Sequence, residues 1–291
     1  MIPPLDPTTP RLQLTGAEFN RLADFIFSKI HIKMPKTGQV VMSARLQSRL
    51  RELGLSSFRE YLDLVTGPGH GGGELERLID TVTTNTTQFF RESHHFDFMT
   101  QTALPDLVKR LGAGVNRPLT AWSAACSSGQ EPYSMAMVLQ DFDRKLPGRA
   151  FRFHILATDI SRQVLDQTRQ ATYPMAETAP IPQAMKKRFL LKSRDPSRAL
   201  VRIVPELRSL VKPGLLNLAE APFRFSRPMD LIFCRNVLIY FREEIKREIV
   251  RKFSQCLSPG GYLFIGNSES LDKMGLPFRQ VSTTTYQRTD P

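Results

Sequence analysis

The sequence predicts an α/β protein in which a parallel, doubly wound sheet carries a small inserted antiparallel β-subdomain and follows an all-α N-terminal domain. Three observations predict this order. From about residue 120, short apolar segments alternate with amphipathic ones, as in a parallel sheet with helices on its faces. That rhythm breaks between residues 173 and 222. Before about residue 82, the apolar residues recur only at helical spacing.

The N-terminal domain begins with a capping signal. The segment Thr15–Glu18 places a hydroxyl at a helix N-cap and a glutamate three residues later. Apolar residues then recur at helical spacing as far as Ile30. Further helices are expected over residues 43–53, 56–65 and 74–81. We therefore expect residues 1–82 to form one helical domain.

Residues 83–291 are expected to form the α/β domain. Strands are predicted at 119–126, 151–158, 229–234 and 262–266, and helices through 135–137, from 161 and over 242–257. The interval 173–222 holds two further expected β segments, 200–204 and 207–211. Parallel sheets bind ligands at the carboxyl ends of their strands, so candidate functional residues are sought there.

Composition and charge restrict the class of protein. The 291 residues include 40 Lys and Arg against 28 Asp and Glu, a formal net charge of +12. This charge favours an acidic partner, which is a nucleic acid, an anionic membrane or an acidic protein. No apolar run approaches the roughly 20 residues that span a bilayer, and the N-terminus lacks the regions of a signal peptide. The expected location is the cytoplasm.

Several kinds of chemistry find no support in the sequence. The three cysteines are widely spaced without a CxxC pair, so we interpret them as packing residues rather than disulfides. The five histidines show no spacing typical of metal ligands, and no metal is expected. A P-loop with GK[ST] is missing, which disfavours phosphate transfer.

Two segments at expected strand ends are candidates for a ligand site. Residues 123–132 follow the first strand and open a helix, and their small side chains let a ligand approach the backbone. The pattern is not GxGxxG, so an ordinary tight turn explains it equally well. Asp159 ends the second strand, where a carboxylate can accept ribose hydroxyls. Its alternative role is the N-cap of a helix beginning near Ser161.

Six segments resemble the CheR family of chemoreceptor glutamate methyltransferases. They occur in consistent order over roughly residues 15–290 and are Thr83–Glu92, Trp122–Ser134, Ala157–Ile160, Asn217–Leu218, Phe233–Phe241 and Gly266–Leu271. One departure is Gln130, where the family commonly has a second glutamate. The resemblance implies an N-terminal helical domain and a Rossmann-like methyltransferase domain at 83–291, with a β-subdomain inserted at about 173–222.

The resemblance also implies a cofactor and a set of site residues. The cofactor is S-adenosylmethionine (SAM), with S-adenosylhomocysteine as product and no metal. Its contacts would fall on Asn85, Thr87, Arg91, Glu131, Asp159, Asn217, Leu218, Cys234 and Arg235. Tyr240 would lie near the transferred methyl group. Arg91 and Tyr240 are the candidates for aligning the reacting groups, and Arg91 would hold the carboxylate of either the substrate or the cofactor.

Each of these two residues has an alternative interpretation. Arg91 fits a surface salt bridge with Glu92 or a neighbour, and Tyr240 fits a half-buried position in the sheet. The expected activity is methyl ester formation on glutamates of methyl-accepting receptors, in the sensory adaptation and signal transduction of bacterial chemotaxis. A glutamate with a pKa near 4.3 is already ionised at neutral pH. No general base is therefore required, and catalysis would rest on alignment and desolvation.

The resemblance makes the acidic cytoplasmic helices of chemoreceptors the expected partner, so the protein would meet the membrane only through its receptor. The residues expected to dock the receptor are Arg45, Arg49, Arg51 and Arg59, for which a solvated helix face is the alternative. Family members that bind a receptor's C-terminal pentapeptide tend to have a glycine in a loop of the β-subdomain. Residues 192–199 contain no glycine, which predicts no such binding.

Two rival functions follow from the same observations. The net charge suggests a methyltransferase that acts on RNA, although no RNA-binding signature accompanies it and no nucleic-acid partner is expected. The second rival is a non-catalytic, SAM-binding sensor or adaptor. The presence of both Arg91 and Tyr240 argues against this second function.

Overall fold

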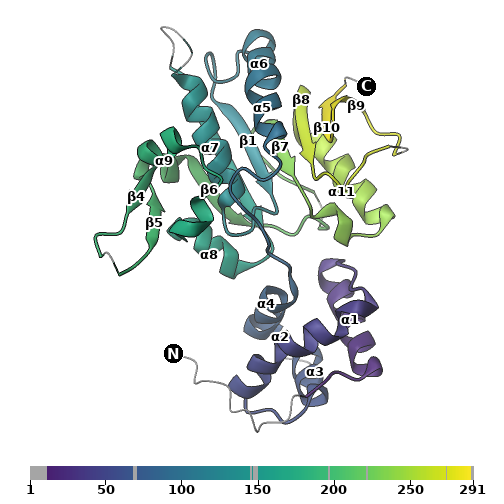
Figure 1. Ribbon diagram of the computed structural model, residues 1–291. Helices are drawn as coiled ribbons and strands as arrows, with labels where there is room; N and C mark the ends of the chain where they lie inside the picture. The colour runs from purple at the N-terminus through teal and green to yellow at the C-terminus, as the bar shows by residue number, and fades with distance from the viewer. Residues whose placement is uncertain are drawn as a thin grey trace. The chain divides into compact units, whose positions relative to one another are not determined.

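A computed structural model describes residues 12–67, 71–144, 146, 150–195, 197–220, 222–272 and 274–289. The chain divides into two compact units, a helical one that ends at Thr84 and an α/β one that begins at Asn85 (Figure 1). Within the described residues, no helix is both long and apolar enough to cross a membrane.

The helical unit consists of α1 (Gly16–Ile30), α2 (Gln39–Glu52), α3 (Phe58–Thr66) and α4 (Gly71–Val82). Helix α1 begins at the predicted capping box: the Thr15 hydroxyl accepts the Glu18 N–H, and the Glu18 carboxylate accepts the Thr15 N–H. Helix α1 packs on α3, and α2 on α4. Fully buried leucines such as Leu22 and Leu46 form the core of this unit.

The α/β unit is built on one seven-stranded sheet. Its strands lie in the order β6 (Val211–Leu215), β2 (Phe153–Asp159), β1 (Leu119–Ala124), β7 (Met229–Cys234), β8 (Leu257–Ile265), β10 (Thr285–Arg288) and β9 (Phe278–Ser282). The first five are parallel, whereas β10 pairs antiparallel with both of its neighbours, β8 and β9. All six residues of β7 are buried, as is typical of a strand covered on both faces.

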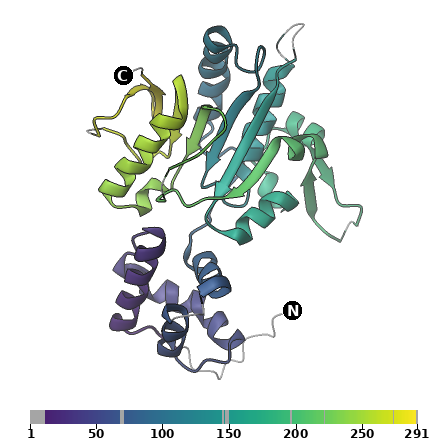
Figure 2. The same ribbon diagram turned by 180° about the vertical axis from the view of Figure 1, so that it is seen from behind.

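Helices cover both faces of this sheet. Helix α7 (Gln130–Asp143) packs on β1, β2 and β6, and α11 (Glu243–Cys256) packs on β8. Figures 1 and 2 show α7 on one face and α11 on the other. The same unit also contains α5 (His94–Phe98), which runs through a π turn into α6 (Leu104–Leu111), and α8 (Arg162–Gln170). The predicted doubly wound α/β class is confirmed.

A second, three-stranded antiparallel sheet has the order β3 (Thr172–Pro174), β5 (Leu200–Ile203) and β4 (Leu190–Lys192). The short 3₁₀ turn Met175–Thr178 and helix α9 (Gln183–Phe189) lie between β3 and β4 in the chain. This sheet is the predicted small antiparallel β unit.

The expected β segment at 207–211 is wrong. Residues 205–210 form helix α10 (Pro205–Leu210), because a proline at the first helical position has the φ angle that a helix needs. Strand β6 begins directly afterwards, at Val211, and pairs with β2 of the main sheet. The last strand of the interval 173–222 therefore belongs to the main sheet and not to an insertion.

The strand order creates a switch point beside β1. From β1 the chain passes to β2 and β6 on one side, and then crosses to β7 and β8 on the other. Ser123 of β1 is in register with Ala157 of β2 and Phe233 of β7, so these strands end at the same edge. Sheets of this kind bind ligands in the crevice at such a point.

Candidate functional site

The predicted cofactor residues of the α/β unit follow the carboxyl ends of four adjacent strands. Asp159 is the last residue of β2, and Cys234 is the last residue of β7. Glu131 lies in the first turn of α7, which follows β1, and Asn217 follows β6. The fold therefore brings residues that are far apart in the chain to one edge of the sheet.

Asp159 is buried and held by backbone donors. One carboxylate oxygen accepts the Ser127 N–H at 2.9 Å, and the other accepts the Ser161 N–H at 3.0 Å. The N-cap of α8 is Ser161, whose hydroxyl accepts the Val164 N–H. The alternative role of Asp159 as the N-cap is therefore wrong. An ionised carboxylate is only an acceptor, which suits the hydroxyl donors of a sugar.

The turn between β1 and α7 is tight although it lacks a GxGxxG pattern. Ala125, Ser127 and Gly129 all have positive φ angles, of 62°, 50° and 97°. A Cβ atom at Gly129 would lie 2.7 Å from the Tyr173 hydroxyl. The Ser127 hydroxyl also donates to the carbonyl of Asn85 at 2.7 Å, so the segment that carries Asn85 lies against this turn.

Arg235 contacts more of the site's polar groups than its neighbours in the chain do, and it joins three of them. Its side chain is 2% exposed and lies between two carboxylates, with Glu92 at 3.0 Å and Glu131 at 3.4 Å. The same guanidinium donates to the backbone carbonyl of Arg91. The second oxygen of Glu131 accepts the Ser123 hydroxyl at 2.6 Å. Arg235 therefore ties the segment around Arg91 to the ends of β1 and β7.

The two carboxylates respond differently to this environment. Burial raises the pKa of Glu131, although the positive charge of Arg235 opposes the rise. Burial also pushes the pKa of Glu92 upward, but Arg235 and hydrogen bonds from Asn267 and Asn236 outweigh it and leave that pKa below its ordinary value. The positive charge of Arg235 therefore favours the ionised form of Glu92, whereas burial has the larger effect on Glu131.

Arg91 lies half-buried on a strained turn. Its neighbours Phe90 and Glu92 have positive φ angles of 54° and 53°, which is rare for residues other than glycine and common at functional sites. The Arg91 guanidinium donates to the Thr86 carbonyl at 3.2 Å. Because Glu92 pairs with Arg235, the proposed salt bridge between Arg91 and Glu92 is not formed. Within the described part of the chain, Arg91 forms no ion pair with a carboxylate, although its positive charge acts to lower the pKa of buried Glu131. Thr87 is half-buried on the same segment.

Tyr240 does not lie in the sheet. It ends the 3₁₀ turn Leu238–Tyr240 that follows β7, and it is half-buried. Its hydroxyl has no hydrogen-bond partner among the residues that the structure describes. Cys234 is fully buried, and burial raises the pKa of its thiol well above the usual range. The thiol is therefore neutral at physiological pH and does not act as a nucleophile.

The segment after β6 is fixed from two directions. The Leu216 N–H donates to the carbonyl of Asp159 at 3.0 Å, and the side-chain oxygen of Asn217 accepts the Ala219 N–H at 3.0 Å. The ammonium group of buried Lys252 donates to the backbone carbonyls of residues 218–220. Asn217 and Leu218 are thereby held beside the end of β2.

The arginines predicted to dock a partner differ in their surroundings. Arg45 donates to the carbonyls at the end of α4, those of Thr81, Val82 and Thr83. Arg49 binds both carboxylate oxygens of Glu74, at 2.9 and 2.5 Å. Neither side chain is a free cation on a solvated face. The two exposed members of the set are Arg51 and Arg59.

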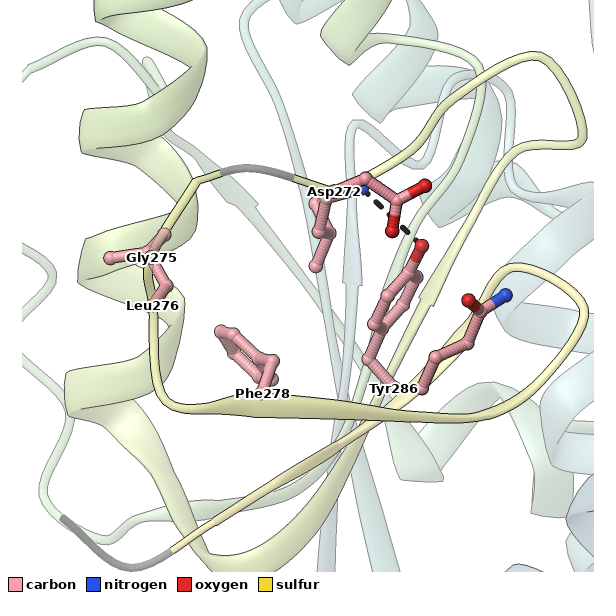
Figure 3. A pocket seen from close by; sticks show the side chains of 7 residues that line it. Asp272, Gly275, Leu276, Phe278 and Tyr286 are labelled. Carbon is pink, nitrogen blue, oxygen red and sulfur yellow. Dashed lines mark hydrogen bonds between the residues drawn. The ribbon is translucent and has the colours of Figure 1, made fainter.

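A pocket of about 290 Å³ lies elsewhere in the α/β unit (Figure 3). It is lined by Leu271, Asp272, Gly275, Leu276, Phe278, Gln280 and Tyr286, which include none of the predicted site residues. Among the described residues, no cluster of three His, Cys, Asp or Glu side chains is arranged to hold a metal ion.

Both units match family models. Residues 17–83 match the all-alpha domain of CheR methyltransferases, and residues 85–287 match the SAM binding domain of CheR methyltransferases. The chain belongs to the CheR methyltransferase family. The predicted family is therefore confirmed, and the protein is a SAM-dependent methyltransferase.

Named relatives of this family align over almost the whole chain. The chemotaxis protein methyltransferase of Escherichia coli is 37% identical over 96% of this chain and 93% of its own length. That of Borreliella burgdorferi is 36% identical over 89% and 90%. Chemotaxis protein methyltransferase 2 of Pseudomonas aeruginosa is 35% identical over 94% and 93%.

Several residues that organise the CheR site were not predicted from the sequence. Glu92 and Glu269 lie in segments that resemble the family, but each also binds residues that are distant in the chain: Glu92 binds Arg235, and Glu269 binds Asn236 and Ile239. Asn236, which has a φ of 59°, bonds to both carboxylates. Both glutamates could have been chosen as candidates because each is an acidic residue within a segment that resembles the family.

Proposed function

We propose that the protein transfers the methyl group of SAM to glutamate side chains of chemoreceptors, giving methyl esters that serve sensory adaptation. The observation that carries this proposal is the match to both CheR domains together with Arg91 and Tyr240 at the carboxyl edge of the sheet. We place the reaction in the cytoplasm, on the acidic helices of the receptor.

The residues at the strand ends fit the chemical groups of the cofactor. Asp159 has acceptor oxygens for the ribose hydroxyls, and Asn85, Thr87, Glu131, Asn217 and Leu218 would surround the adenosine and methionine parts. Cys234 contributes packing as a neutral thiol. Arg235 already donates to Glu92, Glu131 and the Arg91 carbonyl. We therefore assign it the positioning of this set.

The chemistry needs alignment more than proton transfer. SAM supplies an electrophilic methyl group on a sulfonium centre. The attacking glutamate is ionised at neutral pH, so the enzyme has no proton to remove. Arg91 would orient a carboxylate through its guanidinium donors, and the hydroxyl of Tyr240 would face the reacting groups. Alignment of this kind supplies up to about 7–11 kcal/mol in favourable cases.

Labelled SAM tests this function directly. The full-length protein would be incubated with labelled donor and membranes that contain candidate receptors. We expect label on the receptor that mild base releases as methanol, because a glutamate methyl ester hydrolyses readily. Base-stable label, or label on RNA with none on receptors, would contradict the proposal.

The exposed arginines Arg51 and Arg59 are proposed to dock the receptor. Their charges remain available to an acidic helix, whereas Arg45 and Arg49 stabilise the helical unit from within. We expect R51A/R59A to raise the KM for receptor and to leave S-adenosylhomocysteine affinity unchanged. The comparison variant R45A/R49A should instead lower the melting temperature. An unchanged receptor KM in R51A/R59A at physiological salt would rule out this docking role.

Binding of a receptor's C-terminal pentapeptide is predicted to be absent, because the loop at 192–199 lacks glycine. Residue 196 of that loop lies outside the described residues. Titration of such a peptide by calorimetry tests this prediction, and heat at micromolar concentration would overturn it.

A further inference from the structure

The segment Gly266–Leu271 contains a buried carboxylate to which the proposed function gives no role. Glu269 is 5% exposed. One of its oxygens accepts the N–H groups of Gly266 and Asn236 at 2.6 and 3.1 Å, and the other accepts the Ile239 N–H at 3.3 Å. None of the ion pairs in the described ranges involves Glu269. Backbone donors alone therefore compensate its burial.

These hydrogen bonds join two loops that are pressed tightly together. Gly266 follows β8, and a Cβ atom there would lie 2.7 Å from the backbone nitrogen of Asn236. Asn236 follows β7 and has a φ of 59°, a conformation that asparagine tolerates better than most residues. Its side-chain amide also donates to Glu92 at 3.3 Å. Glu269 thus fixes the loop after β7, and the close packing against Gly266 leaves that loop little room to move.

The far end of this loop carries Tyr240. Ile239, the residue before it, is 52% exposed, so burial of its own side chain does little to hold it. The bond from its N–H to Glu269 constrains the 3₁₀ turn immediately beside Tyr240. Because the Tyr240 hydroxyl has no protein partner in the described part of the chain, its direction depends on this backbone.

We propose that Glu269 is a positioning residue for Tyr240, which holds residues 236–239 so that the tyrosine faces the reacting groups. The inference rests on the proposed function for the role of Tyr240. Glu269 itself touches neither substrate nor cofactor in this account.

The variant E269Q separates this role from general stability. The partners of Glu269 among the described residues, which include Leu238, are all backbone N–H donors. The single amide oxygen of a glutamine can accept from one side only, and its NH₂ group then faces a donor on the other. If the amide oxygen keeps the hydrogen bonds from Gly266 and Asn236, the hydrogen bond from the Ile239 N–H is lost. We expect kcat for receptor methylation to fall roughly 10- to 100-fold, as small misplacements of reacting groups do, while S-adenosylhomocysteine affinity is unchanged.

A double-mutant cycle with Y240A shows whether the effect passes through the tyrosine. If it does, E269Q causes no further loss of kcat in the Y240A background, because residues that are coupled through a shared backbone segment are not additive. D230N is the matched control. Asp230 is also a buried carboxylate, but it lies near the start of β7 and accepts from Arg117 and the Thr120 N–H. Its effect should multiply with that of Y240A.

Full multiplication of the E269Q and Y240A effects, or an unchanged kcat in E269Q, would overturn the inference. If E269Q fails to fold, G266A tests the same loop, because its added methyl group displaces the Asn236 backbone. We expect G266A to lower kcat without further loss in the Y240A background, and multiplication there counts against the inference.

Hydrogen exchange distinguishes failure of this inference from failure of the proposed function. The Ile239 amide should exchange faster in E269Q than in the wild type, with no receptor present. If the wild type does not methylate receptors, the proposed function fails and the exchange rate still tests the hold on the loop. If it does methylate them while E269Q matches it in both exchange and kcat, only the inference fails.

Discussion

At the scale of single residues, the site depends on one buried cation shared by two carboxylates. Arg235 is 143 residues away from Glu92 in the chain, so no local pattern announces their pairing. Asp159 was predictable because it ends a strand whose neighbours end at the same edge. The segments of the site are therefore predictable from the sequence. Which residue pairs with which inside the site depends on tertiary contacts and is not.

Replacing Arg235 should be costly. R235M leaves Glu92 and Glu131 buried without their shared cation, and breaking a buried pair in this way costs about 3–5 kcal/mol. We expect a loss of this size in the free energy of unfolding measured with urea. R251M is the comparison variant, because its ion pair with Glu248 has side chains that are 47% and 43% exposed. Equal losses in the two variants would contradict the role of Arg235.

Glu92 should make stability dependent on acid. Its folded pKa lies below its ordinary value, so it contributes stability above its unfolded pKa of about 4.3. This contribution is lost as the pH falls through the folded pKa. The free energy of unfolding of E92Q, measured from pH 7 down to about pH 3.5, should fall less steeply than that of the wild type over the acid range. Parallel curves would show that Glu92 is not the titrating group.

At the scale of secondary-structure elements, the sequence predicts a helix or strand best where the pattern lies within the element itself. The capping box fixes the start of α1, and the apolar run of β7 fixes a central strand. Strands β9 and β10 were not predicted, because β9 is half-exposed and has no clear alternation. Helix α10 was mistaken for a strand because its apolar residues span too short a window to distinguish the two periods.

The turn before α7 gives a prediction at this scale. G129A forces a side chain into a φ of 97° and against Tyr173, and a left-handed conformation costs about 1–2 kcal/mol for a residue with a Cβ atom. We expect about tenfold weaker binding of S-adenosylhomocysteine by calorimetry, since 1.4 kcal/mol corresponds to a factor of ten.

Gly214 of β6 provides the matched control. A Cβ atom there would make only an ordinary contact at 3.9 Å with Thr158, and its φ is not in the left-handed region. G214A should therefore bind the ligand as the wild type does. Similar losses in G129A and G214A would mean that the turn is not special.

At the scale of the whole molecule, the order of strands determines where the chemistry can occur. The reversal beside β1 marks the edge where sheets of this kind bind ligands, and segments from residue 85 to residue 269 converge there. This organisation was predictable, because alternating strands and helices specify a parallel sheet and such sheets bind ligands at that edge. The individual contacts at this edge are not predictable from the sequence, because they join loops that lie far apart in the chain.

The central claim is that this edge binds the methyl donor through Asp159. Calorimetric titration of S-adenosylhomocysteine into the wild type and D159N tests it most directly. An asparagine at 159 would set an NH₂ group against the N–H of Ser127 or Ser161. We predict saturable binding by the wild type and at least about tenfold weaker binding by D159N. No binding by the wild type, or equal affinity in both proteins, would contradict the account.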